Sequence, residues 1–426
     1  MNYHLKKILF VFFLITSTLM ANAQLASITL DSCYVLAKRN YPLVKQYELI
    51  TKSNEYTLEN LSKGYLPQIN ISGQATYQSD VTQLPKGIPG VKVLSKDQYK
   101  IYAEANQVIY DGGVIKGQKK LQEANSMVDL QQLEVELYKL KDHVNQLYFG
   151  ILLIGEQLKQ NALTENDIQL GLYKINAQIA NGTALRSNAD VLRAELLKAE
   201  QQKIELNANR NAFMNMLGLF INKTLNENTA FAKPPNIIPS LEIRRPELLM
   251  YEYQNKVFGA QNNLLTAKNN PKLSFFIQGG YGRPAFNILS NNFDPFYIGG
   301  LRLAFPISGF YTIRNERELI RIRRESIDVQ KNTFLFNTQF ALKQQSADIT
   351  KFQHFLETDD EIITLRTNVK KAALSQLENG IINSSDYLRE VNAEDGARQN
   401  KILHEIQLLM AQYNERNTTG NEKFPE

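Results

Sequence analysis

Few residues in this chain of 426 amino acids combine types and spacings that support catalysis or metal binding. The four histidines lie far apart, and His404-Glu405 lacks the second histidine of a zinc-binding helix. Residues 112–117 have the glycine spacing of a phosphate-binding loop, but Gln118 stands where that loop needs lysine. A turn that ends a strand explains these glycines better. We therefore expect no metal ion, no cofactor and no enzymatic activity.

Charged residues beside two similar turns are stronger candidates for a functional role. Each turn has an Asn-Gly pair, and glycine there favours a left-handed helix end. A Ser/Asp cluster follows each turn and favours the start of a second helix, which its aspartate would cap. Alternatively, Asp386 pairs with Arg389 three residues later on the same helix. The candidates are Gly182, Asp190 and Arg193 at the first turn, and Gly380, Asp386 and Arg389 at the second.

Four segments alternate apolar and polar residues with a period of two, which is typical of β-strands with one apolar face. They predict one hairpin at about residues 66–111 and another at about residues 272–308. Strands of about 10 residues match the length of a membrane-spanning β-strand. The polar faces contain Gln68, Asn70, Ser72, Gln74, Lys100 and Glu104 in the first hairpin, and Lys272, Ser274, Gln278 and Arg302 in the second.

The same hairpins are rich in aromatic residues. These indicate a membrane-interface belt, with ordinary packing of the sheet as the alternative. The alternation also places Ile109 on the apolar face of its strand. The aromatic residues are Tyr99, Tyr102, Phe275, Phe276, Tyr281, Phe293, Phe296 and Tyr297.

Long helices are expected in two stretches that contain no proline, residues 90–233 and 307–424. Apolar residues from Leu133 to Leu158 recur at alternating intervals of four and three, which predicts a supercoiled heptad seam. The longest helices would measure about 100 Å at a rise of about 1.5 Å per residue. The expected helices cover residues 114–180 and 190–220 in the first half, and 310–378 and 386–416 in the second.

The two halves are copies of one another. A shift of 204 residues aligns Pro42 with Pro246 and Tyr77 with Tyr281, and this interval holds eight identities in 36 positions. Average residue usage predicts roughly two. A unit of about 200 residues is too long for a solenoid repeat. The predicted division is a signal peptide 1–23, a first repeat 24–221, a proline-containing linker 222–240, a second repeat 241–417 and a tail 418–426.

The N-terminus is typical of a secretory signal, with Lys6-Lys7, an apolar run over residues 8–14 and a small-residue cleavage site at 21–23. The net charge of +5 includes no basic block, so nucleic acid is a poor partner. A single cysteine excludes an internal disulfide framework. We interpret Cys33 as a buried structural thiol. Lipidation of Cys33 is the alternative, but Asp31-Ser32 makes a poor lipidation box.

Four strands cannot close a barrel, and their apolar faces would meet water. In an exported chain, such strands can enter the outer membrane and pair with other copies, with apolar faces outside and polar faces inside. Two copies would make an eight-stranded barrel filled by its own side chains, so three copies and 12 strands suit a conduit better. The expected fold is therefore an α+β membrane protein. Its trimeric outer-membrane β-barrel has four strands per protomer and continues into a long α-helical tunnel.

Several short motifs resemble the TolC-like outer-membrane efflux proteins, also called outer membrane factors. The motifs follow one another in the family's order within the duplication, and they cover nearly the whole chain after the signal. They lie at residues 28–31 (ITLD), 37–42 (AKRNYP), 65–69 (YLPQI), 108–113 (VIYDGG), 245–248 (RPEL), 305–309 (FPISG) and 419–420 (TG).

This resemblance implies a 12-stranded barrel on a 12-helix periplasmic tunnel, formed by a homotrimer embedded in outer-membrane lipid. It implies two further partners: a periplasmic adaptor (membrane fusion) protein, and an inner-membrane transporter that is proton-driven or of the ABC type. It also places the two turns at the periplasmic tip, where acidic side chains near the second turn ring the constriction. Asp386 matches that motif, and Asp190 is its counterpart in the first repeat. The chain departs from the family at Arg389, where relatives often carry an acid, and at Ile382, where a basic gate residue can occur.

The sequence therefore predicts an outer-membrane channel with a long periplasmic extension. It would be the passive exit duct of a tripartite efflux or type I secretion system. A structural or adhesive trimeric coiled-coil protein of the cell envelope is the alternative. The paired hairpins with one lipid-like face argue against that alternative, and no residue pattern supports a periplasmic enzyme. The sequence does not specify the cargo.

Overall fold

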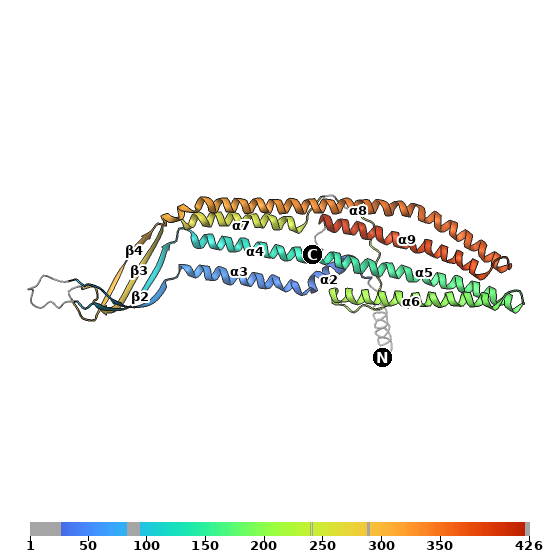
Figure 1. Cartoon of the computed structure of the whole chain (residues 1–426), viewed down its shortest axis with the longest axis horizontal. Helices are drawn as coiled ribbons and strands as arrows, with labels where there is room; N and C mark the ends of the chain where they lie inside the picture. The colour runs from blue at the N-terminus through green and yellow to red at the C-terminus, as the bar shows by residue number, and fades with distance from the viewer. Residues whose placement is uncertain (1–26, 83–93, 239, 241, 288–289, 422–426) are drawn as a thin grey trace, which may run out of the picture. The chain divides into compact units, whose positions relative to one another are not determined.

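The computed structural model describes residues 27–82, 94–238, 240, 242–287 and 290–421 (Figure 1). The expected signal peptide lies outside these residues. The described chain is mostly helical and contains one four-stranded antiparallel sheet. It divides into two compact units, and each unit contains parts of both sequence repeats.

The sheet belongs to the unit formed by residues 45–134 and 246–334. Its strand order follows the chain, and each neighbouring pair is antiparallel, so β1 and β4 are the two free edges. The strands fall within the two predicted hairpins. They are β1 Gln68–Tyr77, β2 Asp97–Tyr110, β3 Lys272–Arg283 and β4 Asp294–Ala304.

Helical segments join the sheet at one end only (Figure 1). Because the strands are antiparallel, the two hairpin connections lie at the other end. Pro246 begins its helix, where its fixed φ and missing N–H are tolerated. The segments are η1 Pro42–Lys45, α3 Gln46–Ser62 and η2 Lys63–Tyr65 before β1, α4 Val114–Tyr138 after β2, α7 Pro246–Lys268 before β3, and η3 Ile307–Tyr311 and α8 Ile313–Glu378 after β4.

A β-bulge interrupts β2 close to its junction with α4. Val108 pairs with Ser274, whereas Tyr110 pairs with Leu273, so Ile109 has no partner in this register. The register assigns no face to an unpaired residue, so the position of Ile109 on the apolar face of β2 stays a prediction. The extra residue breaks the period of two, as bulges do, and it is Tyr110 that aligns with the apolar face.

The second unit consists of the described residues of 1–44, 135–245 and 335–426, and therefore includes the C-terminal part of α8. Its other helices are α2 Leu30–Asn40, α5 Leu140–Ala180, α6 Arg186–Ile221 and α9 Ser384–Thr419. Helix α5 packs against both α6 and α9. The continuous helix expected over residues 114–180 is wrong, because a turn at Lys139 separates α4 from α5. No proline or glycine marks this break, so the sequence carries no signal for it.

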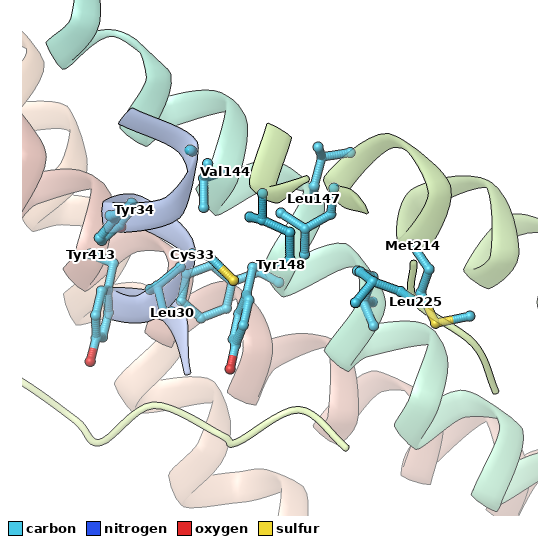
Figure 2. Packing of buried hydrophobic residues seen from close by; sticks show 14 of the residues in the cluster. Leu30, Cys33, Tyr34, Val144, Leu147, Tyr148, Met214, Leu225 and Tyr413 are labelled. Atoms are coloured by element: carbon cyan, nitrogen blue, oxygen red, sulfur yellow. The ribbon is translucent and has the colours of Figure 1, made fainter. Parts of the chain in front are cut away.

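The main core of this unit surrounds α2 (Figure 2). Thr29 and Ser32 form a capping box at the start of α2, which fixes how the helix enters this core. Cys33 is fully buried there, as predicted, and burial raises the pKa of its thiol to about 12. Its neighbours in the cluster include Leu30 and Tyr34 of α2, Val144 and Tyr148 of α5, Met214 of α6 and Tyr413 of α9.

A second core lies beside the two predicted turns and joins α5, α6, α8 and α9. Tyr387 of α9 is fully buried in it and lies against Gly171 of α5, where an added Cβ would come within 2.6 Å of the tyrosine ring. Glycine at this position therefore allows the two helices to approach closely. The other buried members include Ile168, Ile175, Leu192, Leu377 and Val391.

Candidate functional site

The strand register divides the sheet into two chemically different faces. Residues that pair directly across neighbouring strands point to the same face, so each row of the register can be followed across the sheet. One row joins Asn70, Glu104 and Gln278, and the next row along joins Ile71, Ala103 and Gly279. All ten polar residues predicted to share a face do so. They are Gln68, Asn70, Ser72, Gln74, Lys100, Glu104, Lys272, Ser274, Gln278 and Arg302.

An ion pair crosses this polar face. The Nη1 atom of Arg302 on β4 lies 3.6 Å from Oε1 of Glu104 on β2. The guanidinium group also lies over the ring of Phe276, 4.6 Å from its centroid. The ring contact and the ion pair together hold the Arg302 guanidinium on the polar face.

The aromatic residues do not all lie on one face of the sheet. Register places Tyr99, Phe275, Tyr281 and Tyr297 on the apolar face, but places Tyr102, Phe276 and Phe296 on the polar face. The predicted membrane-interface belt stays a prediction, and its residues divide between the two faces because adjacent residues in a strand point to opposite sides. Phe293 precedes β4 and stacks on the rings of Tyr99 and Tyr281.

Arg283 is one of the few polar residues on the largely apolar face, together with Asp97 and Gln107, and it lies at the end near the hairpin connections. It pairs with Asp97, and its guanidinium carbon lies 5.5 Å and 5.2 Å from the ring centroids of Tyr99 and Phe293. Aromatic cover and an ion pair together offset the cost of a cation on this face.

The two turns in the second unit have nearly the same backbone. Gly182 has φ +73° and Gly380 has φ +66°, as predicted for a left-handed residue after the end of a helix. Asp190 lies 3.7 Å from Arg193, and Asp386 lies 3.5 Å from Arg389. These pairs are local and exposed. The structure thus brings each predicted aspartate together with its predicted arginine within a single helix.

The predicted capping role of the two aspartates is wrong. Helix α6 begins after Leu185, which makes no side-chain cap, and Asp190 lies beyond the first turn. Helix α9 is capped by Asn383, whose side chain accepts a hydrogen bond from the backbone N–H of Asp386. Both helices begin a few residues earlier than predicted, and this shift removes the aspartates from the capping position. Asp386 still lies in the first turn, where a negative charge favours the helix dipole.

A partly buried ionic cluster between α5, α8 and α9 was not predicted from the sequence. Lys370 Nζ lies 2.6 Å from Asp167 Oδ2 and 2.5 Å from Glu394 Oε2. Glu394 Oε1 also accepts hydrogen bonds from Arg398 at 2.7 Å and from Thr367 at 2.6 Å. These five residues form what we call the ionic clamp, because they join three helices.

The electrostatics of the ionic clamp favour the charged states. Burial acts to raise the pKa of Glu394, but hydrogen bonds from Lys370, Thr367 and Arg398 outweigh it and lower the pKa to about 2. Burial likewise acts to lower the pKa of Lys370, and its bonds to Asp167 and Glu394 raise it instead. The Tyr387 hydroxyl donates a hydrogen bond of 3.0 Å to the Asp167 carbonyl, which ties the clamp to the second core.

A weak sequence signal for the ionic clamp exists in α9. Tyr387, Val391, Glu394 and Arg398 follow one another at intervals of four, three and four, so two charged residues occupy an apolar stripe. Charged residues in such a stripe are stable only when they are paired. Their partners on α5 and α8 are distant in sequence and give no signal of their own.

Neither a metal site nor a membrane-spanning helix is found among the described residues. No group of three or more His, Cys, Asp or Glu side chains in the described chain is placed to hold a metal ion. No helix in that part of the chain is both long enough and apolar enough to cross a membrane.

The fold defined by this sheet and these helices is that of bacterial outer-membrane channels. No protein-family model and no curated protein sequence matches the chain. Solved structures match it over nearly its whole length. The channel-forming protein CusC shares 12% identity, covers 92% of each chain and gives a TM-score of 0.70.

Two further channels show the same similarity. The outer-membrane channel OprN is 12% identical, with 93% of this chain and 91% of OprN covered and a TM-score of 0.68. The Campylobacter jejuni CmeC outer membrane channel is 13% identical, with 93% and 87% covered and a TM-score of 0.62. The TolC-like fold predicted from the sequence motifs is thus confirmed.

Proposed function

We propose that this chain is the subunit of a homotrimeric channel in the outer membrane, which serves as the passive exit duct of a tripartite efflux or type I secretion system. In this proposal three sheets form a 12-stranded barrel, and the helices extend into the periplasm. The duct has no catalytic centre. An inner-membrane transporter, proton-driven or of the ABC type, supplies the energy through a periplasmic adaptor protein.

The observation that carries this proposal is the division of an open sheet into two faces. The apolar face presents Ile71, Tyr297 and Leu303 fully to the outside of the protomer, at 77%, 82% and 72% exposure. Four strands with edges at β1 and β4 leave both the edges and this face uncovered. Pairing β1 of one copy with β4 of the next would satisfy both edges, and lipid would cover the apolar face.

The helices also expose apolar residues that a trimer would cover. Phe336 and Phe340 of α8, and Leu197 and Ile204 of α6, are more than half exposed in the single chain. An amphipathic helix with such residues outside its core requires a neighbouring helix. Adjacent copies in a ring would provide one.

Within this proposal the two turns form the periplasmic end of the duct and control its opening. Asp190 and Asp386 face an arginine within their own helices, so the end of the duct is nearly neutral rather than acidic. The ionic clamp would hold α8 and α9 against α5 in the closed state. Opening would then require α8 and α9 to move away from Asp167.

The test is to purify the full-length mature protein in detergent, determine its subunit number and reconstitute it in planar bilayers. We expect a trimer and stepwise ion conductance. A folded trimer without conductance that fractionates with the outer membrane would contradict the proposal and favour a structural or adhesive cell-envelope protein. A folded monomer would contradict the barrel itself.

The ionic clamp provides a second test of the same proposal. Replacing Lys370 with Met should raise the open probability of the reconstituted channel, because the ionic clamp loses its central cation. Lys371 is exposed and adjacent, so Lys371→Met is the matched control. Equal open probabilities for the two variants would contradict the closing role of the clamp.

A further inference from the structure

Positive charge gathers at the end of the sheet that joins the helices. The residues lie in the first two turns of α4, at the end of α7 and at the start of α8. None of them takes part in an ion pair with another described residue. They are Lys116, Lys119, Lys120, Lys268 and Arg314, and we call them the basic collar.

Acidic residues lie nearby but are fewer than the cations. Asp111 accepts hydrogen bonds from two backbone N–H groups at the start of α4, at 2.8 Å and 2.5 Å, and Glu316 lies in the first turn of α8, so these two carboxylates offset the helix dipoles. Glu318 pairs with Arg321 at 2.8 Å. The five cations of the basic collar outnumber Asp111, Glu316 and Glu123, so this end of the sheet carries a net positive charge that favours an anion.

Exposed aromatic residues lie at the same end of the sheet as the basic collar. They lie just before β1, at the end of β2 and just after β4, next to the basic collar in the chain. In outer-membrane barrels, girdles of aromatic residues are typical of the boundary between hydrocarbon and headgroups. The residues are Tyr65, Tyr110, Phe305, Phe310 and Tyr311, and all are more than two-fifths exposed.

We propose that the basic collar binds the headgroups of anionic phospholipids in the periplasmic leaflet of the outer membrane. The aromatic residues fix the depth of the sheet in the bilayer, and at that depth the collar meets phosphate groups. Each lysine or arginine near an anionic surface adds to the attraction, and a trimer would repeat the collar three times. This inference rests on the proposed membrane location, but it adds a lipid preference that channel function does not require.

The test is lipid retention by the full-length protein in detergent, measured by native mass spectrometry. The probes are dioleoylphosphatidylglycerol and dioleoylphosphatidylcholine at equal concentration. Wild type should retain the anionic lipid roughly tenfold better, and Lys116→Gln/Lys119→Gln/Lys120→Gln should lose most of that preference. The matched control, Lys159→Gln/Lys198→Gln/Lys203→Gln, removes the same charge from exposed positions on α5 and α6 and should retain it.

The outcomes separate this inference from the proposed function. Equal retention of the two lipids by wild type, or equal losses in both triple variants, would overturn the basic collar as a lipid site. Displacement of the lipid by millimolar inorganic phosphate would also overturn it and indicate a site for free phosphate. Channels that conduct but show no lipid preference would refute this inference alone. Lipid preference without conductance would refute only the proposed duct.

Discussion

Lys370 on α8 lies 2.6 Å from Asp167 on α5, and this ion pair joins two helices whose contacting residues are 203 positions apart in sequence. The lysine also contacts Glu394 on α9, so one ammonium group bridges two carboxylates. Lys370 is the only member of the ionic clamp that contacts both acids, because Arg398 pairs with Glu394 alone. Loss of Lys370 would leave Asp167 without its ion-pair partner and Glu394 with Arg398 only.

The first prediction concerns the stability of this contact. Lys370→Met should lower the free energy of unfolding by about 2 kcal/mol, because Asp167 loses its ion-pair partner and Glu394 loses one of two cationic partners in a partly buried position. The loss should appear as a lower midpoint of helix unfolding, measured by circular dichroism. Lys371→Met, on the exposed neighbour, should change the midpoint little. Similar midpoints for the two variants would contradict the energetic role of the clamp.

A second prediction concerns acid. The pKa of Glu394 is about 2 in the folded protein, below its ordinary value of 4.5, so its charge stabilises the fold above the unfolded-state pKa. That stabilisation is lost progressively as pH falls from about 4.5 towards about 2. Unfolding midpoints recorded across this window should fall more steeply for wild type than for Glu394→Gln. The same dependence of the unfolding midpoint on pH in wild type and Glu394→Gln would contradict the lowered pKa of Glu394.

The third prediction separates two glycines by their backbone conformation. Gly380 has φ +66°, which costs residues with a Cβ about 1 kcal/mol or more, so Gly380→Ala should lower stability. Gly396 lies inside α9 with open space around its Cα, so Gly396→Ala should raise stability by up to about 1 kcal/mol. Thermal melts of the two variants check this, and the same sign for both would refute the conformational argument.

The two faces of the sheet can be distinguished by cysteine labelling of channels in planar bilayers. Ser72→Cys and Ser274→Cys on the polar face should react with a charged methanethiosulfonate reagent, and conductance should fall. Ala75→Cys and Ala103→Cys on the apolar face are the controls and should not respond. The native Cys33 should not react with the reagent, because its side chain is buried and its pKa is raised to about 12. A response from the apolar positions would reverse the proposed orientation of the sheet.

The last prediction concerns the two exposed aspartates near the turns. Asp190→Ala with Asp386→Ala should cost less than about 0.5 kcal/mol per residue, because exposed pairs contribute little to stability. If these residues line the end of the duct, single-channel conductance or ion preference should change. Asp360→Ala, at an exposed paired aspartate elsewhere on α8, is the control. Unchanged conductance would limit Asp190 and Asp386 to local pairing with their arginines.

Local patterns were sufficient to predict much of this fold. The period of two placed all ten polar strand residues on one face, because each side chain in a strand alternates with its neighbour regardless of what it contacts. Asn-Gly pairs likewise predicted the left-handed positions of Gly182 and Gly380, since the conformation is intrinsic to the local sequence.

Features that depend on distant contacts were not predictable in the same way. The ionic clamp needs Asp167, Lys370 and Glu394 to meet from three helices, and no spacing within any one helix encodes that meeting. Helix starts were also misplaced by a few residues. That small error was enough to assign a capping role to Asp190 and Asp386, because capping belongs to one position only.

The bulge at Ile109 determines which face of the sheet carries the Tyr110 side chain. Since Ile109 is the extra residue, Tyr110 aligns with Leu273 on the apolar face instead of with the polar face that even-numbered positions of β2 otherwise form. An evenly alternating strand would place this phenol on the polar face, which the proposed barrel turns to its interior. In that proposal, the insertion moves Tyr110 to the lipid-facing side at the bilayer boundary without changing the identity of any aromatic residue.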